Sequence, residues 1–190
     1  METSSATATE IQSHAVAGKY LTFILGREEY GLEILRVREI MGVVPVTSLP
    51  QMPHFIKGVI NLRGLVIPIV DLRLKFGLPE IPHTKETCII VMDLDRKLTG
   101  IVVDSVSEVL DISEKEIDDT PSFGASVNAD FILGIGKVKG KVKILLDISK
   151  VLAADHPSLE RLTGSARPEE AMPTGNARLE AMDMEVEHAR

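Results

Sequence analysis

Short apolar runs, separated by glycines, prolines and charged residues, recur along most of the chain. The runs are rich in Val and Ile and have the length of β-strands rather than of long helices. Their bounds predict strands over 19–25, 28–33, 59–62, 65–70, 87–93 and 98–103, a partly alternating strand over 106–112 and a hairpin over 131–148.

Helical signals are few and short. Asp71 is expected to cap a short helix over 72–76, and a second helix is expected to begin at Ser149. The segment 34–41 fits both helical spacing and strand alternation, and we interpret it as a helical turn that runs into a strand.

The same pattern occurs twice in the chain. When Phe55 is placed over Phe131 and both stretches are read forward without a gap, apolar positions coincide and identical residues meet at Phe131, Ile132, Gly134, Gly140, Val142 and Asp147. A second match places Gly31, Val37 and Glu39 over Gly100, Val106 and Glu108. Each half therefore reads as about five strands and a short helix.

A five-stranded sheet of this size removes its exposed edges by closing on itself. We therefore predict a mainly β fold with two tandem SH3-like five-stranded β-barrel subdomains and short helices. The first barrel is expected at about 19–82 and the second at 83–154, followed by a short C-terminal helix at 155–164.

The two ends of the chain differ from this folded part. Residues 1–18 are small and polar, which predicts a disordered leader, and residues 165–190 read as a mobile acidic tail. The leader has no Lys, no Arg and no long apolar run, so a secretory signal is not expected. No run reaches the roughly 18 apolar residues of a membrane span, and the lone Cys88 cannot form an internal disulfide. We expect a cytoplasmic protein without membrane insertion.

Charge and composition argue against nucleic-acid binding. The formal net charge is -7, and the predicted folded part, 19–152, holds 17 basic and 18 acidic residues. A small barrel that binds nucleic acid needs a basic face with exposed aromatic side chains. Five Phe, two Tyr and no Trp leave little aromatic surface for that function.

No constellation for catalysis, a metal or a cofactor stands out. The five histidines lie in predicted loops or tails, without metal-ligand spacing. Glu39 and Glu108 are matched positions, but no histidine or cleft signature accompanies them. P-loop, GxSxG and strand-associated GxGxxG motifs are absent as well. An enzyme is therefore a remote reading, and no cofactor is predicted.

The two predicted hairpin turns differ in their surroundings. Gly64 and Gly140 are the expected turn glycines. Around Gly140, lysines alternate with valines in KVKGKVK, which reads as a solvent-facing strand pair. Around Gly64, Asn61 and Arg63 stand among apolar residues. Arg63 is either a solvated turn residue or an interface residue, and the comparison with the other copy places a partner contact at Asn61 and Arg63.

Three stretches resemble the CheW family of bacterial chemotaxis adaptors. They are EYGLEILRVREI (Glu29–Ile40), FIKGVINLRGLVIPIVDLRLKF (Phe55–Phe76) and GIVVDSVSEVL (Gly100–Leu110). The resemblance covers about 19–152. It implies two five-stranded barrels without catalytic activity, in a stand-alone adaptor that couples chemoreceptors, the methyl-accepting chemotaxis proteins, to the CheA histidine kinase.

The resemblance also implies partners and contact positions. Partners would be chemoreceptor cytoplasmic tips, the regulatory domain of CheA and other CheW-like domains in rings, at membrane-bound receptor arrays. Family receptor-contact positions fall on Ile34, Val37, Glu39, Gly58 and Arg63, and a further one falls on Cys88, where the family usually has Val. An adaptor of a different chemosensory pathway, such as surface motility, is the closest alternative.

Overall fold

The computed structural model describes residues 15–94, 96–119 and 130–153. The predicted helix at 155–164, the tail at 165–190 and most of the predicted leader lie outside these residues. The described part contains the strands β1 (Gly18–Leu25), β2 (Glu28–Glu33), β3 (Val37–Gly42), β4 (Ile56–Leu62), β5 (Leu65–Asp71), β6 (Cys88–Leu94), β7 (Lys97–Val103), β8 (Ser105–Ile112), β9 (Ile117–Asp118), β10 (Ile132–Val138) and β11 (Lys141–Leu146). Its helices are α1 (Leu72–Lys75), α2 (Ile148–Ala153) and the 3₁₀ turns η1 (Ile34–Arg36) and η2 (Glu114–Glu116).

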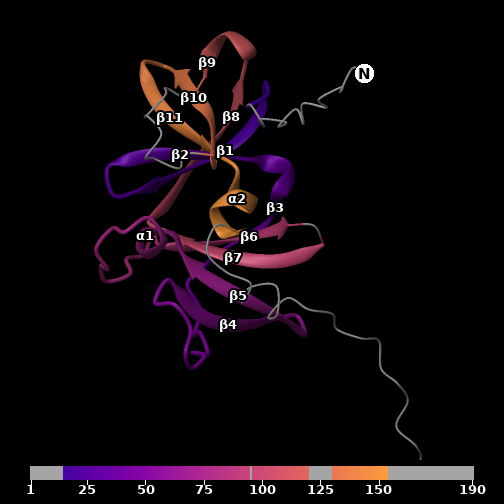
Figure 1. The fold of residues 1–190 in the computed structure, drawn as a ribbon, viewed down its shortest axis with the longest axis vertical. Helices are drawn as coiled ribbons and strands as arrows, with labels where there is room; N and C mark the ends of the chain where they lie inside the picture. The colour runs from indigo at the N-terminus through magenta and orange to yellow at the C-terminus, as the bar shows by residue number, and fades with distance from the viewer. Residues whose placement is uncertain (1–14, 95, 120–129, 154–190) are drawn as a thin grey trace, which may run out of the picture.

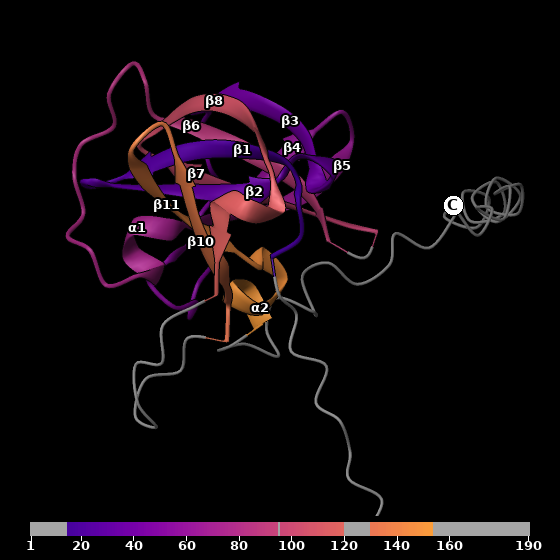
Figure 2. The same cartoon turned by 90° about the horizontal axis from the view of Figure 1, so that it is seen from above.

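These strands form two sheets, which we call subdomains 1 and 2. Subdomain 1 has the strand order β3-β6-β7-β5-β4, and subdomain 2 has the order β8-β1-β2-β11-β10-β9. Figure 1 shows the two sheets one above the other, with α2 between them. Figure 2 shows α1 and α2 on one side of the molecule and β3 and β8 on the opposite side. The predicted mainly β fold with two subdomains is confirmed.

The predicted boundary between the barrels is wrong. Subdomain 1 combines β3, β4 and β5 of the first half with β6 and β7 of the second, and subdomain 2 takes β1 and β2 from the first half. The turn η1 carries the chain from β2 in one sheet to β3 in the other. Local pattern identifies each hairpin, but the long-range pairing that joins hairpins into a sheet is not encoded locally. The two halves are therefore interleaved rather than placed in tandem.

In each sheet, the chain continues past an edge strand and then pairs with a strand at the opposite edge. After β3, the chain reaches Thr47, whose N–H and C=O both bond to Val59 of β4 at 2.9 Å. After β8, the chain passes η2 and reaches β9, which pairs with β10. In both subdomains, the segment after one edge strand thus pairs with the strand at the opposite edge, as expected for closed sheets.

The repeat is preserved in the strand register. β5 and β7 pair in parallel with Ile69 opposite Gly100, and β11 and β2 pair in parallel with Leu145 opposite Gly31. A Cβ on Gly100 would lie 2.5 Å from Ile69 Cδ1, and one on Gly31 would lie 2.7 Å from Leu145 Cδ2. Only glycine leaves room for the large residue of the neighbouring strand at both seams.

The apolar runs are explained by three clusters of buried side chains. One cluster lies in subdomain 1 around Ile67, Ile69 and Ile89, and one lies in subdomain 2 around Tyr20 and Leu145. The third, which we call the shared core, joins both sheets and α2: Leu21, Phe23, Leu25, Leu32, Val70, Leu72, Ile90, Met92, Ile101, Val103, Leu146, Ile148, Val151 and Leu152. Because successive strand residues point to opposite faces, strands such as β6 bury one face in their own sheet and the other in the shared core.

Candidate partner-binding surface

The turn between β4 and β5 presents Arg63 at the surface of subdomain 1. Arg63 and Gly64 both have positive φ, 53° and 88°, as a two-residue hairpin turn of type I′ requires. The Asn61 side-chain oxygen accepts a hydrogen bond from the Gly64 N–H at 2.8 Å and closes the turn. The predicted role of Gly64 in the turn is therefore confirmed, and Asn61 has a structural role in the same turn.

Arg63 makes a specific contact with another predicted site residue. Its side chain is 77% exposed, and its Nη2 donates to Glu39 Oε1 at 3.0 Å. Glu39 lies on β3, so the ion pair joins the hairpin tip to a strand that is not its sheet neighbour. An exposed pair of this kind stabilises a fold by only about 0–1 kcal/mol. The pair therefore presents two charges at fixed positions without being a main source of stability.

Exposed apolar side chains follow both members of this ion pair along the chain. Leu65 and Val66 directly follow the turn, and Ile40 follows Glu39 on β3; all three are exposed. Charges on an apolar surface are a common composition of protein interfaces, where Arg is enriched. The arrangement suits recognition of another protein better than chemistry on a small molecule.

Ile34 and Val37 lie where the chain crosses between the subdomains. Both are half-buried and pack against the shared core. Between them in sequence, Leu35 is 92% exposed. Complete burial of a leucine is worth about 1.5–3 kcal/mol, so this side chain contributes little to the fold as it stands. The exposure of Leu35 was not predicted from the sequence, because a turn of three residues is too short for hydrophobic periodicity to distinguish a buried face from an exposed one.

Two other predicted positions are constrained by the fold. Gly58 is buried at φ 136°, and a Cβ there would lie 2.0 Å from the Thr47 carbonyl oxygen. Cys88 is half-buried at the start of β6, opposite Gly42, and burial raises the pKa of its thiol. Cys88 packs against the same shared core as Val37, at the other end of the β3–β6 pairing. The structure thus joins Arg63 to Glu39 and joins Ile34, Val37 and Cys88 through the shared core. A partner contact at any of these positions stays a prediction.

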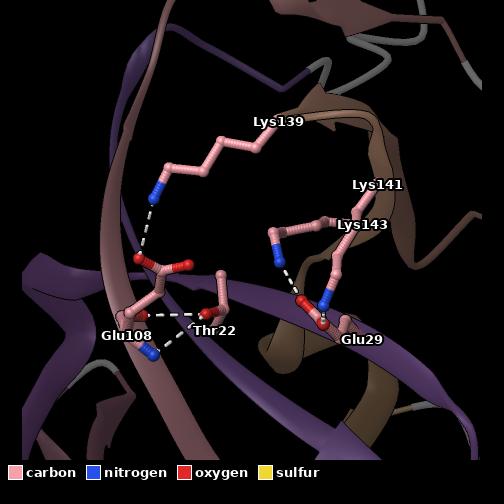
Figure 3. Close-up of polar contacts among 6 residues, drawn as sticks. All are labelled: Thr22, Glu29, Glu108, Lys139, Lys141 and Lys143. Carbon is pink, nitrogen blue, oxygen red and sulfur yellow. Dashed lines mark hydrogen bonds and ion pairs between the residues drawn. The ribbon is translucent and has the colours of Figure 1, made fainter.

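Subdomain 2 carries a counterpart of the Arg63–Glu39 pair. Lys139 occupies the matched turn position at φ 52°, beside the predicted turn glycine Gly140 at φ 75°. Lys139 Nζ lies 3.2 Å from Glu108 Oε2, the matched glutamate on β8 (Figure 3). At this glutamate the Thr22 hydroxyl donates to the Glu108 carbonyl oxygen at 2.8 Å, which fixes β8 against β1.

An apolar groove lies apart from the predicted site residues. Its volume is about 440 Å³, and its walls come from Tyr30, Lys75, Phe76, Phe131, Ile132, Ile144, Leu146 and Val151. Among the described residues, no three His, Cys, Asp or Glu side chains are placed to hold a metal ion. In the same part of the chain, every helix is too short or too polar to cross a bilayer.

Two interleaved β subdomains that carry a surface of mixed apolar and charged side chains form a β protein suited to binding other proteins. A family model described as "CheW-like domain" matches residues 19–156, so the chain belongs to the CheW family. The chain is 39% identical over 154 residues to the chemotaxis protein CheW of Klebsiella aerogenes. This alignment covers 81% of the chain and 93% of that protein. The chain is also 34% identical over 155 residues to the chemotaxis protein CheW of Rhizobium meliloti, covering 80% and 97%.

A solved structure agrees with this assignment. The crystal structure of the scaffolding protein TtCheW from Thermoanaerobacter tengcongensis has a TM-score of 0.65 to this chain at 34% sequence identity. The match covers 72% of this chain and 92% of the solved one. The shared fold therefore extends over nearly all of that relative.

Proposed function

We propose that this chain is a non-catalytic adaptor of bacterial chemotaxis that couples chemoreceptors to the CheA histidine kinase. The observation that carries the proposal is the match of residues 19–156 to the CheW-like domain, together with relatives that are named chemotaxis protein CheW. The exposed Arg63–Glu39 pair, with the exposed Leu65 and Val66 directly after the turn, supports a function in protein binding. The adaptor acts in the cytoplasm, at arrays of membrane-bound receptors.

The receptor surface of this proposal is centred on Arg63 and Glu39. A receptor tip is an amphipathic helical hairpin, which needs an apolar contact area and charges that set its register. Leu65 and Val66 provide exposed apolar area beside Arg63, and Ile34 and Val37 provide half-buried apolar area next to Glu39 along the chain. The ends of the two subdomains are left for the regulatory domain of CheA and for other CheW-like domains in a ring.

Co-sedimentation with purified partners tests the proposal. The full chain is mixed with a receptor cytoplasmic fragment and, separately, with the regulatory domain of CheA. We expect binding to both, and the absence of binding to either partner would contradict the adaptor function. Binding to a receptor and kinase of a surface-motility pathway alone would assign the chain to that pathway instead.

A matched pair of variants tests the receptor surface. Arg63→Ala is expected to weaken receptor binding about tenfold or more, as a central interface arginine does. Lys139→Ala is the control, because it removes a cation at the matched turn position with a similar ion pair, 3.2 Å against 3.0 Å. Equal receptor affinities for the two variants would contradict the proposed surface, while leaving the adaptor function itself intact.

A further inference from the structure

A lysine is buried in subdomain 2 at the seam between the two halves of the chain. Lys143 on β11 is only 3% exposed, and its ammonium group pairs with Glu29 on β2. Glu29 is mostly buried as well, and its other carboxylate oxygen lies 3.0 Å from Lys141 Nζ (Figure 3). The sequence pattern KVKGKVK predicts solvent-facing lysines, and for Lys143 this prediction is wrong. Lys143 lies farther along β11 from the turn than the exposed Lys141 and Val142, where the strand becomes buried.

The repeat shows that a lysine is not required at this place in the fold. Lys143 matches Ile67, and Glu29 matches Leu98; both of these residues belong to the apolar cluster of subdomain 1. The same backbone seam is thus built once with two apolar residues and once with a buried ion pair. Replacing a buried ion pair with apolar residues is often neutral or stabilising. Stability alone therefore does not account for Lys143 and Glu29.

The position of the Glu29–Lys143 pair suggests a role in the choice of strand partners. β2 belongs to the first half of the chain and β11 to the second, and they meet in parallel with Ile144 opposite Tyr30. Because the two halves are similar, β2 could instead pair with β5 of its own half, or with β5 of another copy. Glu29 would then face Ile67 and lose both lysines. In the corresponding pairing of β11 with β7, Lys143 would face Leu98. Each alternative buries a charge without a partner, which costs far more than the native pair gains.

We propose that the Glu29–Lys143 ion pair determines which halves of this chain recognise each other. It directs the first half, β1 to α1, toward a second half, β6 to α2, and disfavours the pairing of like halves. The two halves are joined by the segment 79–86, and every residue of this segment is exposed. A second copy of this chain offers the same complementary half, so the partner that fits this seam is the second half of another copy.

Charge reversal in the full chain tests the proposal. Glu29→Lys places three lysines together, and Lys143→Glu buries two carboxylates together. Each single variant is expected to melt about 10 °C lower than the parent chain, or to fail to fold. The double variant in one chain restores a Lys–Glu contact of reversed polarity and is expected to recover monomer and melting temperature.

Mixing the two single variants gives the sharper result. Both are unfolded in denaturant, combined in equal amounts and refolded together. If halves are exchanged between copies, the lysine introduced at position 29 meets the glutamate introduced at position 143 at one seam, and Glu29 meets Lys143 at the other. The expected product is a heterodimer by light scattering, with its melting temperature restored. A mixture that yields no more dimer or folded protein than either variant alone would overturn the proposal, as would single variants as stable as the parent.

Two controls separate recognition from general destabilisation. Glu108→Lys and Lys139→Glu make the same charge changes at a pair with side chains 47% and 70% exposed, where little loss and no heterodimer are expected. The double variant Glu29→Leu, Lys143→Ile copies the matched residues of subdomain 1. It is expected to melt within a few degrees of the parent but to refold to monomer in lower yield at high concentration, with the rest as larger species. An undiminished yield of monomer would show that the pair is a packing feature only.

Discussion

The hairpins β4–β5 and β10–β11 share a turn conformation but carry different side chains. Each turns on a positively charged residue and a glycine with positive φ, and in each the cation contacts a glutamate at a matched position. Beside the first turn lie Leu65 and the buried Ile67; beside the second lie Lys141 and Lys143. The comparison shows that glycines and backbone register preserve the fold, while the side chains at the two ends have become suited to different contacts.

The largest expected difference between the two copies lies at Gly58 and Gly134. A Cβ at Gly58 would lie 2.0 Å from the Thr47 oxygen, whereas one at Gly134 would lie 3.0 Å from the Asp118 oxygen. We expect Gly58→Ala to cost about 3 kcal/mol or more and Gly134→Ala about 1 kcal/mol, measured by urea unfolding. Equal losses would mean that the closure of subdomain 1 at Thr47 is as tolerant as that of subdomain 2.

The turn glycines should behave alike. Gly64 and Gly140 have φ of 88° and 75°, and neither has a heavy atom close to the position of a Cβ. Valine is strongly disfavoured at such φ values, so Gly64→Val and Gly140→Val are each expected to cost about 1–3 kcal/mol. Thermal unfolding of both variants provides the measurement. A clear inequality would show that the two turns are not conformational equivalents.

The matched aspartates before the helices give a smaller effect. Asp71 accepts a hydrogen bond from the Leu74 N–H at 3.2 Å, and Asp147 accepts from the Ser149 N–H at 3.1 Å. Replacement with alanine is expected to cost about 1 kcal/mol at each site, slightly more at the buried Asp71, when followed by urea unfolding. An unchanged stability for Asp71→Ala would contradict the capping role.

Removal of either turn cation should hardly affect stability. Arg63→Ala and Lys139→Ala each remove an exposed ion pair, and a loss below about 1 kcal/mol is expected for both. Differential scanning calorimetry is the measurement. A large fall in melting temperature for Arg63→Ala alone would make this residue structural rather than a partner contact.

An ion pair without a counterpart in subdomain 2 gives the smallest effect. Arg38 on β3 pairs with Asp93 on β6, and this hydrogen bond lowers the pKa of Asp93 below its ordinary value of 3.8. The stabilisation is therefore present above about pH 4 and is lost as the pH falls through the lowered pKa. Asp93→Asn should reduce the difference in melting temperature between pH 5 and pH 3 slightly. A steeper dependence in the variant would contradict this sign.

Local features were predictable from the sequence because their causes are local. The Arg63-Gly64 turn and the cap at Asp71 both depend on residues close together in the chain. The assignment of strands to sheets was not predictable in this way. A repeat of five strands reads as one barrel, and nothing in the pattern around η1 shows that the chain leaves its sheet there.

The candidate site was predictable only in part. Arg63 and Glu39 do meet, whereas a partner contact at the turn that the contrast between the two hairpin sequences points to stays a prediction. The burial of Lys143 was missed because alternating lysines and valines look alike on an open strand and on a covered one. Gly58 was predicted as a receptor contact because of the family resemblance. The structure shows in addition that its backbone lies too close to Thr47 for a Cβ, which the sequence alone does not reveal.

The interleaving of strands also governs when the molecule can form during synthesis. Subdomain 2 contains the first strand of the described chain, β1, and the last, β11, so its sheet has to wait for nearly the whole folded part to leave the ribosome. Subdomain 1 is complete only after β7. Until then β1 and β2 form at most an isolated hairpin, which is marginally stable in water. Translation of this chain therefore produces its second subdomain last, although that subdomain begins first.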